Sequence, residues 1–299
     1  MLLSTSKIFK GFNSLSGIEV LIIYSWVSGA KVLAHKLNDS LKAAANYKVA
    51  ALEELENLHE MVESSNLVIS VGGDGTILRV IRLTVDCKVP VVGVNMGRIG
   101  YLTEQSTENA LERVKEYIAG HGIVEKRTMI EVAIAPRVEE FNDQNWEYAL
   151  NEAVIGRGQV ARLTFVEAYI DGNLFANYAA DSVIVATATG STGYALSAGG
   201  PVLYPESKSL ILKPVAPQLA TDAAVVLHPG CQIDLKVRPD ENAVVTLDGF
   251  NDIIVPSGSF VRIRESSKQA LFLKSRISHQ FAPVLTDRLS SAKFISSND

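Results

Sequence analysis

The 299-residue sequence is poor in cysteine and in long apolar runs. Its two cysteines, Cys87 and Cys231, form neither a Cys-x-x-Cys pair nor a metal-ligand spacing, so we interpret them as ordinary thiols of a reducing compartment. The longest apolar run, residues 18–27, is shorter than the roughly 20 residues that cross a bilayer. The first residues contain no uninterrupted apolar segment of the secretory type. These absences favour a cytoplasmic protein with no membrane partner.

The chain also has no excess of positive charge. It carries 28 Lys and Arg against 33 Asp and Glu, which gives a formal net charge of −5 at pH 7. A general nucleic-acid binder needs a basic face that neutralises phosphates, so we expect no nucleic-acid partner. Any phosphate-bearing ligand has to be held by local groups. The five histidines show no metal-ligand clustering in the sequence.

Three common motifs for phosphate binding and nucleophilic catalysis are absent. No Walker lysine follows a glycine loop, and residues 97–100 lack the spacing of a dinucleotide-binding fingerprint. Ser191 does not lie in a Gly-x-Ser-x-Gly elbow, because residue 189 is Thr, and no histidine is near it in sequence. The sequence therefore favours neither a P-loop enzyme nor a serine hydrolase.

The first 126 residues alternate predicted strands and helices. Apolar runs predict strands at residues 18–27, 67–71 and 89–95. Helical spacing of apolar residues predicts helices at residues 27–45, 52–62, 76–85 and 108–120; in the first of these the apolar residues are Val32, Leu33, Leu37 and Leu41. This alternation indicates a parallel sheet with helices on its faces, in which ligands bind beyond the carboxyl ends of the strands.

The helical period disappears from about residue 127. Strands are predicted at residues 128–136, 146–156, 163–170, 182–189, 231–237, 243–248 and 259–265. We therefore expect an α/β domain over residues 1–126 and a mainly β domain over residues 127–274. Residues 275–299 have weak helical spacing and are expected to pack back on the first domain.

The strand at residues 67–71 runs directly into Gly-Gly-Asp-Gly-Thr at residues 72–76. In one interpretation the glycines supply positive φ angles, and Asp74 is an Asx-turn residue or a helix N-cap. In the other, the glycines bring backbone close to phosphate, Asp74 contacts a hydroxyl or a metal ion, and Arg79 supplies positive charge. The sequence alone leaves both open. The next loop, residues 95–103, belongs to the same edge of the predicted sheet.

Two further stretches carry polar residues in the β region. Residues 187–201, TATGSTGYALSAGGP, gather glycines and hydroxyls around Tyr194, which favours a shaped loop that wraps a ligand over a flexible connection. Asn151 and Glu152 interrupt an apolar strand, where they would point to opposite faces and each need a polar partner. That partner is either a neighbouring strand or a ligand. Asp181 is similarly a turn residue or a ligand contact.

Taken in order, these stretches resemble the NAD kinase family. The family pattern comprises GGDGT followed by Leu-Arg, the segment N-x-G-x-(L/I)-G-(F/Y)-L-T from Asn95 to Thr103, an Asn-Glu pair, and D-x5-T-x-T-G-S-T-x-Y-x-L-S-A-G-G-P from Asp181 to Pro201. The resemblance covers about residues 68–250. It implies an N-terminal α/β domain and a C-terminal β domain that binds the dinucleotide, with the site between them. It also implies phosphorylation of the adenosine ribose 2′-hydroxyl of NAD by ATP or polyphosphate, which gives NADP.

The resemblance assigns roles by position. Asp74 would orient the ribose hydroxyl and accept its proton late in a loose transition state, while Mg²⁺ on the donor phosphates offsets the repulsion. Asn151 and Glu152 would bind adenine and the ribose hydroxyls. The other implied nucleotide contacts are Gly72, Gly73, Gly75, Thr76, Arg79, Asn95, Tyr101, Leu102, Arg162, Asp181, Thr189, Thr192, Gly193, Tyr194, Ala195, Leu196, Ser197 and Ala216. The family commonly forms dimers or tetramers, so a homo-oligomer is expected.

The sequence departs from the family pattern at two places. The stretch 216–226 lacks the family's Arg-Pro, and Phe250 follows Asp248-Gly249 where the family has Gln. Two other functions are weighed: a non-catalytic NAD(P)-binding regulator could lose Asp74, and a GGDGT lipid kinase would need an apolar or basic docking surface. No segment offers such a surface, and Asp74 is present. The preferred phosphoryl donor and the use of NADH are not determined by the sequence.

Overall fold

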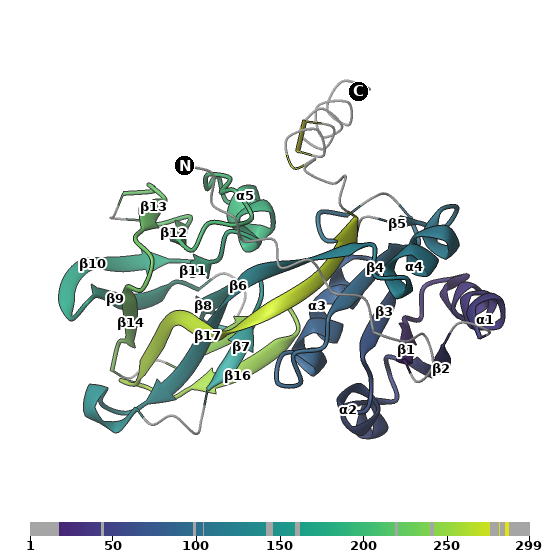
Figure 1. Ribbon diagram of the computed structural model, residues 1–299. Coiled ribbons are helices and arrows are strands. Elements are labelled where there is room, and N and C mark those ends of the chain that lie inside the picture. The colour runs from purple at the N-terminus through teal and green to yellow at the C-terminus, as the bar shows by residue number, and fades with distance from the viewer. Residues whose placement is uncertain are drawn as a thin grey trace. The chain divides into compact units, whose positions relative to one another are not determined.

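The structure, a computed structural model, describes residues 18–42, 45–97, 100–103, 105–141, 146–158, 162–218, 221–239 and 242–275, with residues 281, 285 and 286 (Figure 1). The chain divides into two compact units, residues 1–126 with 270–299 (unit 1) and residues 127–269 (unit 2). It passes from one unit to the other within β6 (Gly122–Ala135) and again within β17 (Phe260–Ser275). The expected helix in residues 275–299 lies almost entirely outside the described residues.

Unit 1 is built on a parallel sheet in the order β2-β1-β3-β4. Strands β1 (Glu19–Tyr24), β3 (Leu67–Gly72) and β4 (Val91–Asn95) confirm the three predicted apolar strands. Strand β2 (Asn46–Ala51) was not predicted, because this edge strand alternates exposed and partly buried residues and has no apolar run. The short β5 (Gln105–Ser106) and the end of β17 pair in parallel with β4.

Among the described residues, the helices that accompany this sheet are α1 (Ala30–Leu41), α2 (Leu55–Glu63), α3 (Asp74–Thr84) and α4 (Ala110–Ile118). Helices α1 and α4 share one apolar core with β1 and β3, whereas α3 contacts β3, β4 and α2. Val32, expected on the buried face of the first helix, is 72% exposed. The buried positions are Ala30, Ala34, Leu37 and Leu41, and a residue two places after Ala30 lies on the opposite side of a helix.

Unit 2 is a pair of antiparallel sheets packed face to face (Figure 1). One has six strands in the order β13-β12-β11-β8-β15-β16. Their bounds are β8 (Glu152–Gly156), β11 (Ser182–Ala186), β12 (Leu210–Val215), β13 (Val225–Leu227), β15 (Ala243–Leu247) and β16 (Asn251–Val255). Residues such as Ile155 and Val185 from this sheet enter the same core as Ile233 and Ile263 from the other.

The other sheet of unit 2 runs β10-β9-β14-β17, with β6 paired to β17 and β7 paired to β6. Its remaining strands are β7 (Glu147–Ala149), β9 (Thr164–Ile170), β10 (Asn173–Ala180) and β14 (Gln232–Val237), and a short 3-10 helix, η1 (Val138–Glu140), follows β6. The expected α/β unit and mainly β unit are thus both confirmed. Strands β10, β12, β13 and β16 were not predicted; β10 and β16 expose much of their length, and their ladder partners stabilise them.

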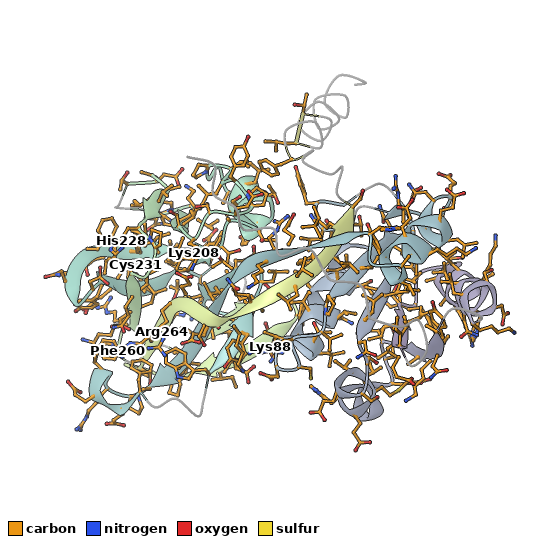
Figure 2. The ribbon with its side chains drawn as sticks, in the orientation of Figure 1. Lys88, Lys208, His228, Cys231, Phe260 and Arg264 are labelled. Carbon is orange, nitrogen blue, oxygen red and sulfur yellow. The ribbon has the colours of Figure 1, made fainter. Side chains whose placement is uncertain are left out.

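Arg262 and Arg264 form a cationic row on β17: they alternate with the core residues Val261 and Ile263 and so lie on the face opposite the core, where Figure 2 labels Arg264. Arg262 binds the Asp234 carboxylate through two bonds of 2.7 and 3.0 Å, and Arg264 binds Glu131 at 2.6 Å. Because carboxylates neutralise these cations, the row is not a free basic surface of the kind that phosphate backbones require.

Candidate active site

The segment from Gly72 to Thr76 joins β3 to α3 at the carboxyl edge of the parallel sheet. Gly73 is the N-cap, in an extended conformation, and its carbonyl accepts the Thr76 N–H at 3.0 Å. Asp74 is the first helical residue, in the turn where the helix dipole favours a carboxylate. Gly72, Gly73 and Gly75 have no positive φ, so the interpretation of these glycines as positive-φ residues is wrong.

Steric space explains these glycines instead. A Cβ on Gly72 would lie 2.2 Å from Thr76 Oγ1 and 2.8 Å from Ser25 Oγ, so no side chain fits there. A Cβ on Gly73 or Gly75 would meet no atom within 4 Å. The turn therefore presents open space beside its backbone, which is what close approach of a phosphate group needs.

The Asp74 carboxylate is held by the backbone of a later loop. Oδ2 accepts the Tyr101 N–H at 2.8 Å, and Oδ1 accepts the Leu102 N–H at 3.3 Å. The loop can approach this closely only because residue 100 is glycine, since a Cβ on Gly100 would lie 1.7 Å from Asp74 Oδ1. The Gly100 N–H donates to Thr103 Oγ1 at 2.7 Å. Asp74 is thus fixed in orientation but only half-buried, and a carboxylate has lone pairs beyond those two bonds.

The other predicted residues of unit 1 lie around the same edge. Asn95 is buried at the end of β4, opposite Gly72 in the sheet register, and its Oδ1 accepts the Gly97 N–H at 3.2 Å. Leu102 is buried and Tyr101 is half-buried. Arg79 lies on the exposed side of α3. Unit 1 therefore brings the predicted turn residues and the described residues of the 95–103 loop together at one edge.

In unit 2, the predicted strand 146–156 is broken at Leu150 and Asn151. The Asp248 carboxylate accepts the N–H groups of Leu150 at 2.9 Å, Asn151 at 2.7 Å and Glu152 at 3.2 Å. These donors are therefore unavailable to a strand ladder, and the chain passes from β7 in one sheet to β8 in the other. The expectation that Asn151 and Glu152 alternate across one strand is wrong, because Asn151 lies between the two strands.

The Asn151 and Glu152 side chains end in buried atoms that have no hydrogen-bond partner among the described residues. These atoms are Asn151 Oδ1 and Glu152 Oε2. Glu152 is 7% exposed, and burial, followed by the negative charge of Asp248, raises its pKa to about 8; a bond from the Tyr194 N–H acts in the opposite direction. A buried polar atom without a partner is costly, so both atoms indicate a place for a polar ligand.

Residues 187–201 form two short helices, η2 (Gly190–Thr192) and α5 (Tyr194–Ser197), which agrees with a shaped loop. Thr187 Oγ1 donates to the Leu150 carbonyl at 2.6 Å and accepts the Gly190 N–H at 3.1 Å. A Cβ on Gly190 would lie 2.1 Å from the Asn151 carbonyl oxygen. The loop therefore packs directly on the Asn151 backbone.

Of the predicted contact residues in this loop, Gly193 lies beside the Glu152 side chain, and the others are its neighbours in the sequence. A Cβ on Gly193 would lie 3.2 Å from Glu152 Oε2, and the neighbouring Tyr194 has an exposed ring. Thr189 is buried, and its Oγ1 accepts a bond from Arg127 at 3.4 Å. Of the remaining residues, Thr192 and Leu196 are half-buried, Ala195 is buried and Ser197 is exposed.

Three predicted residues of unit 2 lie away from the Asn151–Glu152 pair. Asp181 and Ala216 are neighbours at the start of β11, where the Asp181 N–H donates to the Val215 carbonyl at 3.0 Å. Glu152 pairs with Ala186 at the other end of the same strand. Arg162 is exposed, in the segment between β8 and β9. The predicted set of unit 2 thus occupies both ends of β11.

Sequence reasoning assigned no site role to four residues that shape these sites: Gly100, Thr187, Gly190 and Asp248. All four lie in stretches that match the family pattern, but each acts on a residue distant in the chain, so the pattern does not reveal what it contacts. For Asp248 the available signals were an Asp-Gly turn between two predicted strands and its match to the family's Asp-Gly pair.

Metal and membrane features are limited among the described residues. No group of three or more His, Cys, Asp or Glu side chains there is arranged to hold a metal ion. Both cysteines have free thiols, and Cys231 is buried next to the turn that contains His228 (Figure 2). Within the described parts of the chain, no helix has the length and apolar character needed to span a membrane.

Comparison with known proteins gives concordant matches. The profile of the ATP-NAD kinase N-terminal domain matches residues 26–122, and that of the ATP-NAD kinase C-terminal domain matches residues 150–275. An NAD kinase of Dehalococcoides mccartyi is 35% identical over 270 residues, which cover 86% of this chain and 94% of the relative. An NAD kinase of Chloroflexus aggregans is 33% identical over 273 residues, which cover 91% and 98%.

Solved structures agree with these matches. The structure of an NAD kinase from Archaeoglobus fulgidus in complex with ATP is similar, with a TM-score of 0.72 and 29% identity, and the match covers 87% of this chain and 94% of that one. Yeast NADH kinase complexed with NADH has the same fold, with a TM-score of 0.80 and 21% identity, covering 91% and 88%. The family resemblance of the motifs is therefore confirmed, and the chain belongs to the ATP-NAD kinase family.

Proposed function

We propose that this protein is an NAD kinase. It transfers a phosphoryl group from ATP, or from polyphosphate, to the adenosine ribose 2′-hydroxyl of NAD and so makes NADP. The observation that carries the proposal is the Asp74 carboxylate, which two backbone N–H groups hold at 2.8 and 3.3 Å beside a turn with open space at Gly73 and Gly75. A fixed carboxylate next to a phosphate-accessible turn suits hydroxyl activation.

The transfer itself needs little covalent chemistry from the protein. The ribose oxygen attacks the terminal phosphorus of the donor, the bond from that phosphorus to the bridging oxygen breaks, and ADP leaves with ATP as donor. Asp74 orients the hydroxyl and takes its proton as the new bond forms. A carboxylate is a weak base for an alcohol, but a loose transition state lets the proton leave late. General-base assistance of this kind is worth roughly 10²–10⁴-fold in rate.

The dinucleotide contacts come from the other predicted residues. Asn151 and Glu152 offer the unpartnered buried oxygens Oδ1 and Oε2, which as acceptors suit the ribose hydroxyls and the exocyclic amino group of adenosine. The exposed ring of Tyr194 provides an aromatic surface next to them. The predicted contacts at Asp181 and Ala216, at the far end of β11, belong to the remainder of the dinucleotide.

Mg²⁺ enters as part of the donor substrate. The described residues include no group of carboxylates that would form a protein cage for the ion, and the Asp74 oxygens already accept two N–H groups. Mg²⁺ binds a few carboxylates together with substrate phosphates in other phosphoryl-transfer enzymes, so a phosphate-bound ion fits this site. A cytoplasmic homo-oligomer remains part of the proposal, and light scattering of the purified protein tests its size.

The test is NADP formation from NAD with a panel of donors: ATP, other nucleoside triphosphates and polyphosphate, each with Mg²⁺. A dehydrogenase specific for NADP reports the product, and NADH replaces NAD in a parallel series. The wild-type chain is expected to make NADP with at least one donor. Absence of product with every donor, from protein that binds NAD, would leave the non-catalytic regulator as the better account.

Replacement of Asp74 tests its assigned role. We expect Asp74→Asn to lower turnover at least about a hundredfold, because Asn cannot accept the proton, and to keep NAD affinity within several-fold. Titration calorimetry gives the affinity and the coupled assay gives the turnover. Equal losses of binding and turnover would refute the role of Asp74 as a base.

A further inference from the structure

Asp248 makes four hydrogen bonds with the backbone of residues 150–152. It occupies the turn between β15 and β16 with a φ of 51°, and it is 8% exposed. Its carboxylate accepts three consecutive N–H groups, and its own N–H donates to the Glu152 carbonyl at 3.0 Å. Glu152 is therefore held at both its N–H and its carbonyl by one residue 96 positions away.

This arrangement has an electrostatic consequence for the Glu152 side chain. Burial is the largest cause that favours the neutral carboxyl group, and the Asp248 charge is the second. The Tyr194 N–H favours the ionised group but does not outweigh them, so the pKa lies at about 8. Three groups from the surrounding elements face the Glu152 carboxyl group: the Asp248 carboxylate on the β15–β16 turn, the Asn151 amide, and the Tyr194 N–H of α5. The cation on β6, Arg127, donates to Thr189 Oγ1.

A bound dinucleotide strengthens both causes. It removes further water from a carboxyl oxygen, Oε2, that already has no partner, and its diphosphate adds negative charge. Each effect disfavours the carboxylate. A neutral carboxyl group also offers one O–H donor besides its acceptor lone pairs, whereas a carboxylate only accepts.

We infer that Asp248 is a positioning residue that presents Glu152 to the adenosine part of NAD as a neutral carboxylic acid. This inference rests on the proposed function. Asp248 acts through Glu152 in two ways: its three N–H bonds fix the break between β7 and β8, and its charge opposes ionisation of the neighbouring side chain. NAD affinity then depends on a proton that the protein already holds at neutral pH.

Glu152→Gln tests the neutral acid, because Gln has the same shape and cannot ionise. NAD affinity is measured by titration calorimetry from about pH 6 to about pH 9. Wild-type affinity is expected to fall above its midpoint near pH 8, by up to about tenfold for each further pH unit. Glu152→Gln is expected to bind within about threefold of wild type at pH 7 and to lose this pH dependence. A large loss of affinity at pH 7 in Glu152→Gln would overturn the inference, because it would mean that the carboxylate is the binding form.

Asp248→Asn tests the positioning role, with Asp171→Asn as the matched control. Asp171 lies in another Asp-Gly turn of unit 2, with a φ of 50°, and accepts the Gln232 N–H at 2.9 Å, but it does not contact Glu152. Asp248→Asn is expected to weaken NAD binding at pH 7 by about tenfold and to move the midpoint to lower pH. Asp171→Asn should change neither.

The double variant Asp248→Asn/Glu152→Gln separates charge from general damage. Its affinity should not depend on pH, whereas a pH shift that persists in it would overturn the link between the two residues. If Asp248→Asn does not fold, Asp248→Glu replaces it, because Glu retains the negative charge. Asp248→Glu is expected to bind NAD more weakly but to keep the midpoint of the pH dependence near pH 8. A midpoint at lower pH in Asp248→Glu would refute the charge effect. Wild-type NADP formation is assayed separately, so failure of the proposed function is recognised without these binding data.

Discussion

Gly100→Ala is the sharpest test of how Asp74 is held. The added methyl carbon would lie 1.7 Å from Asp74 Oδ1, 2.4 Å from Cγ and 2.6 Å from Oδ2, far inside any allowed contact. Either the carboxylate rotates away or the loop retreats, and both movements break the bonds from Tyr101 and Leu102. Hydrogen bonds to charged groups contribute about 1.5–3 kcal/mol each, so the variant should lose roughly 2 kcal/mol or more of folding free energy.

The larger effect is expected on turnover. A base displaced from the hydroxyl forfeits its assistance, so kcat should fall at least about a hundredfold while the KM for NAD changes by less than about threefold. Coupled NADP formation gives both constants, and urea unfolding gives the stability.

Gly97→Ala is the matched control for this variant. Gly97 lies in the same loop, has no positive φ, and its added Cβ would meet no atom within 4 Å. It should therefore remain active and change stability by less than about 1 kcal/mol. A folded Gly100→Ala protein with near-normal kcat would refute the reasoning, because it would show that the position of Asp74 does not limit the reaction.

Three further predictions concern Glu152 and Asp234. Glu152→Ala should mainly weaken NAD binding, and unchanged affinity in titration calorimetry would contradict its assignment to the ribose. Because folding raises the pKa of Glu152 to about 8, its contribution to stability is fully present below the ordinary glutamate range and is lost as the pH rises toward 8. Glu152→Gln should therefore gain stability relative to wild type between pH 5 and pH 8, on the order of a few kcal/mol, and a constant difference in urea unfolding would contradict this. Asp234→Ala leaves Arg262, which is largely buried, without its bidentate partner and should cost about 3 kcal/mol, whereas Asp39→Ala, which removes an exposed pair with Lys42, should cost less than about 1 kcal/mol in the same experiment.

The family and the class of the fold could be predicted from the sequence, because the signals are local. The strand before Gly72 and the helix after it follow from an apolar run and from helical spacing within about 20 residues. The edge strand β2 was missed for the converse reason: its residues have no apolar run, and its pairing with β1 is what makes it a strand. Val32 was assigned to the wrong face because the face of the helix that is buried is the one with Ala30, Ala34, Leu37 and Leu41, and packing on the sheet selects that face.

The sequence by itself determined which chemical groups the protein brings to its ligands, since GGDGT, the Asn-Glu pair and the Tyr194 loop are contiguous patterns. Only the tertiary structure decided how those groups are held and that burial raises the pKa of Glu152. Asp74 is held by N–H groups 27 and 28 residues later, and Glu152 by a carboxylate 96 residues later. Hydrogen bonding, burial and electrostatic interaction depend on distance in space, and chain order does not record that distance.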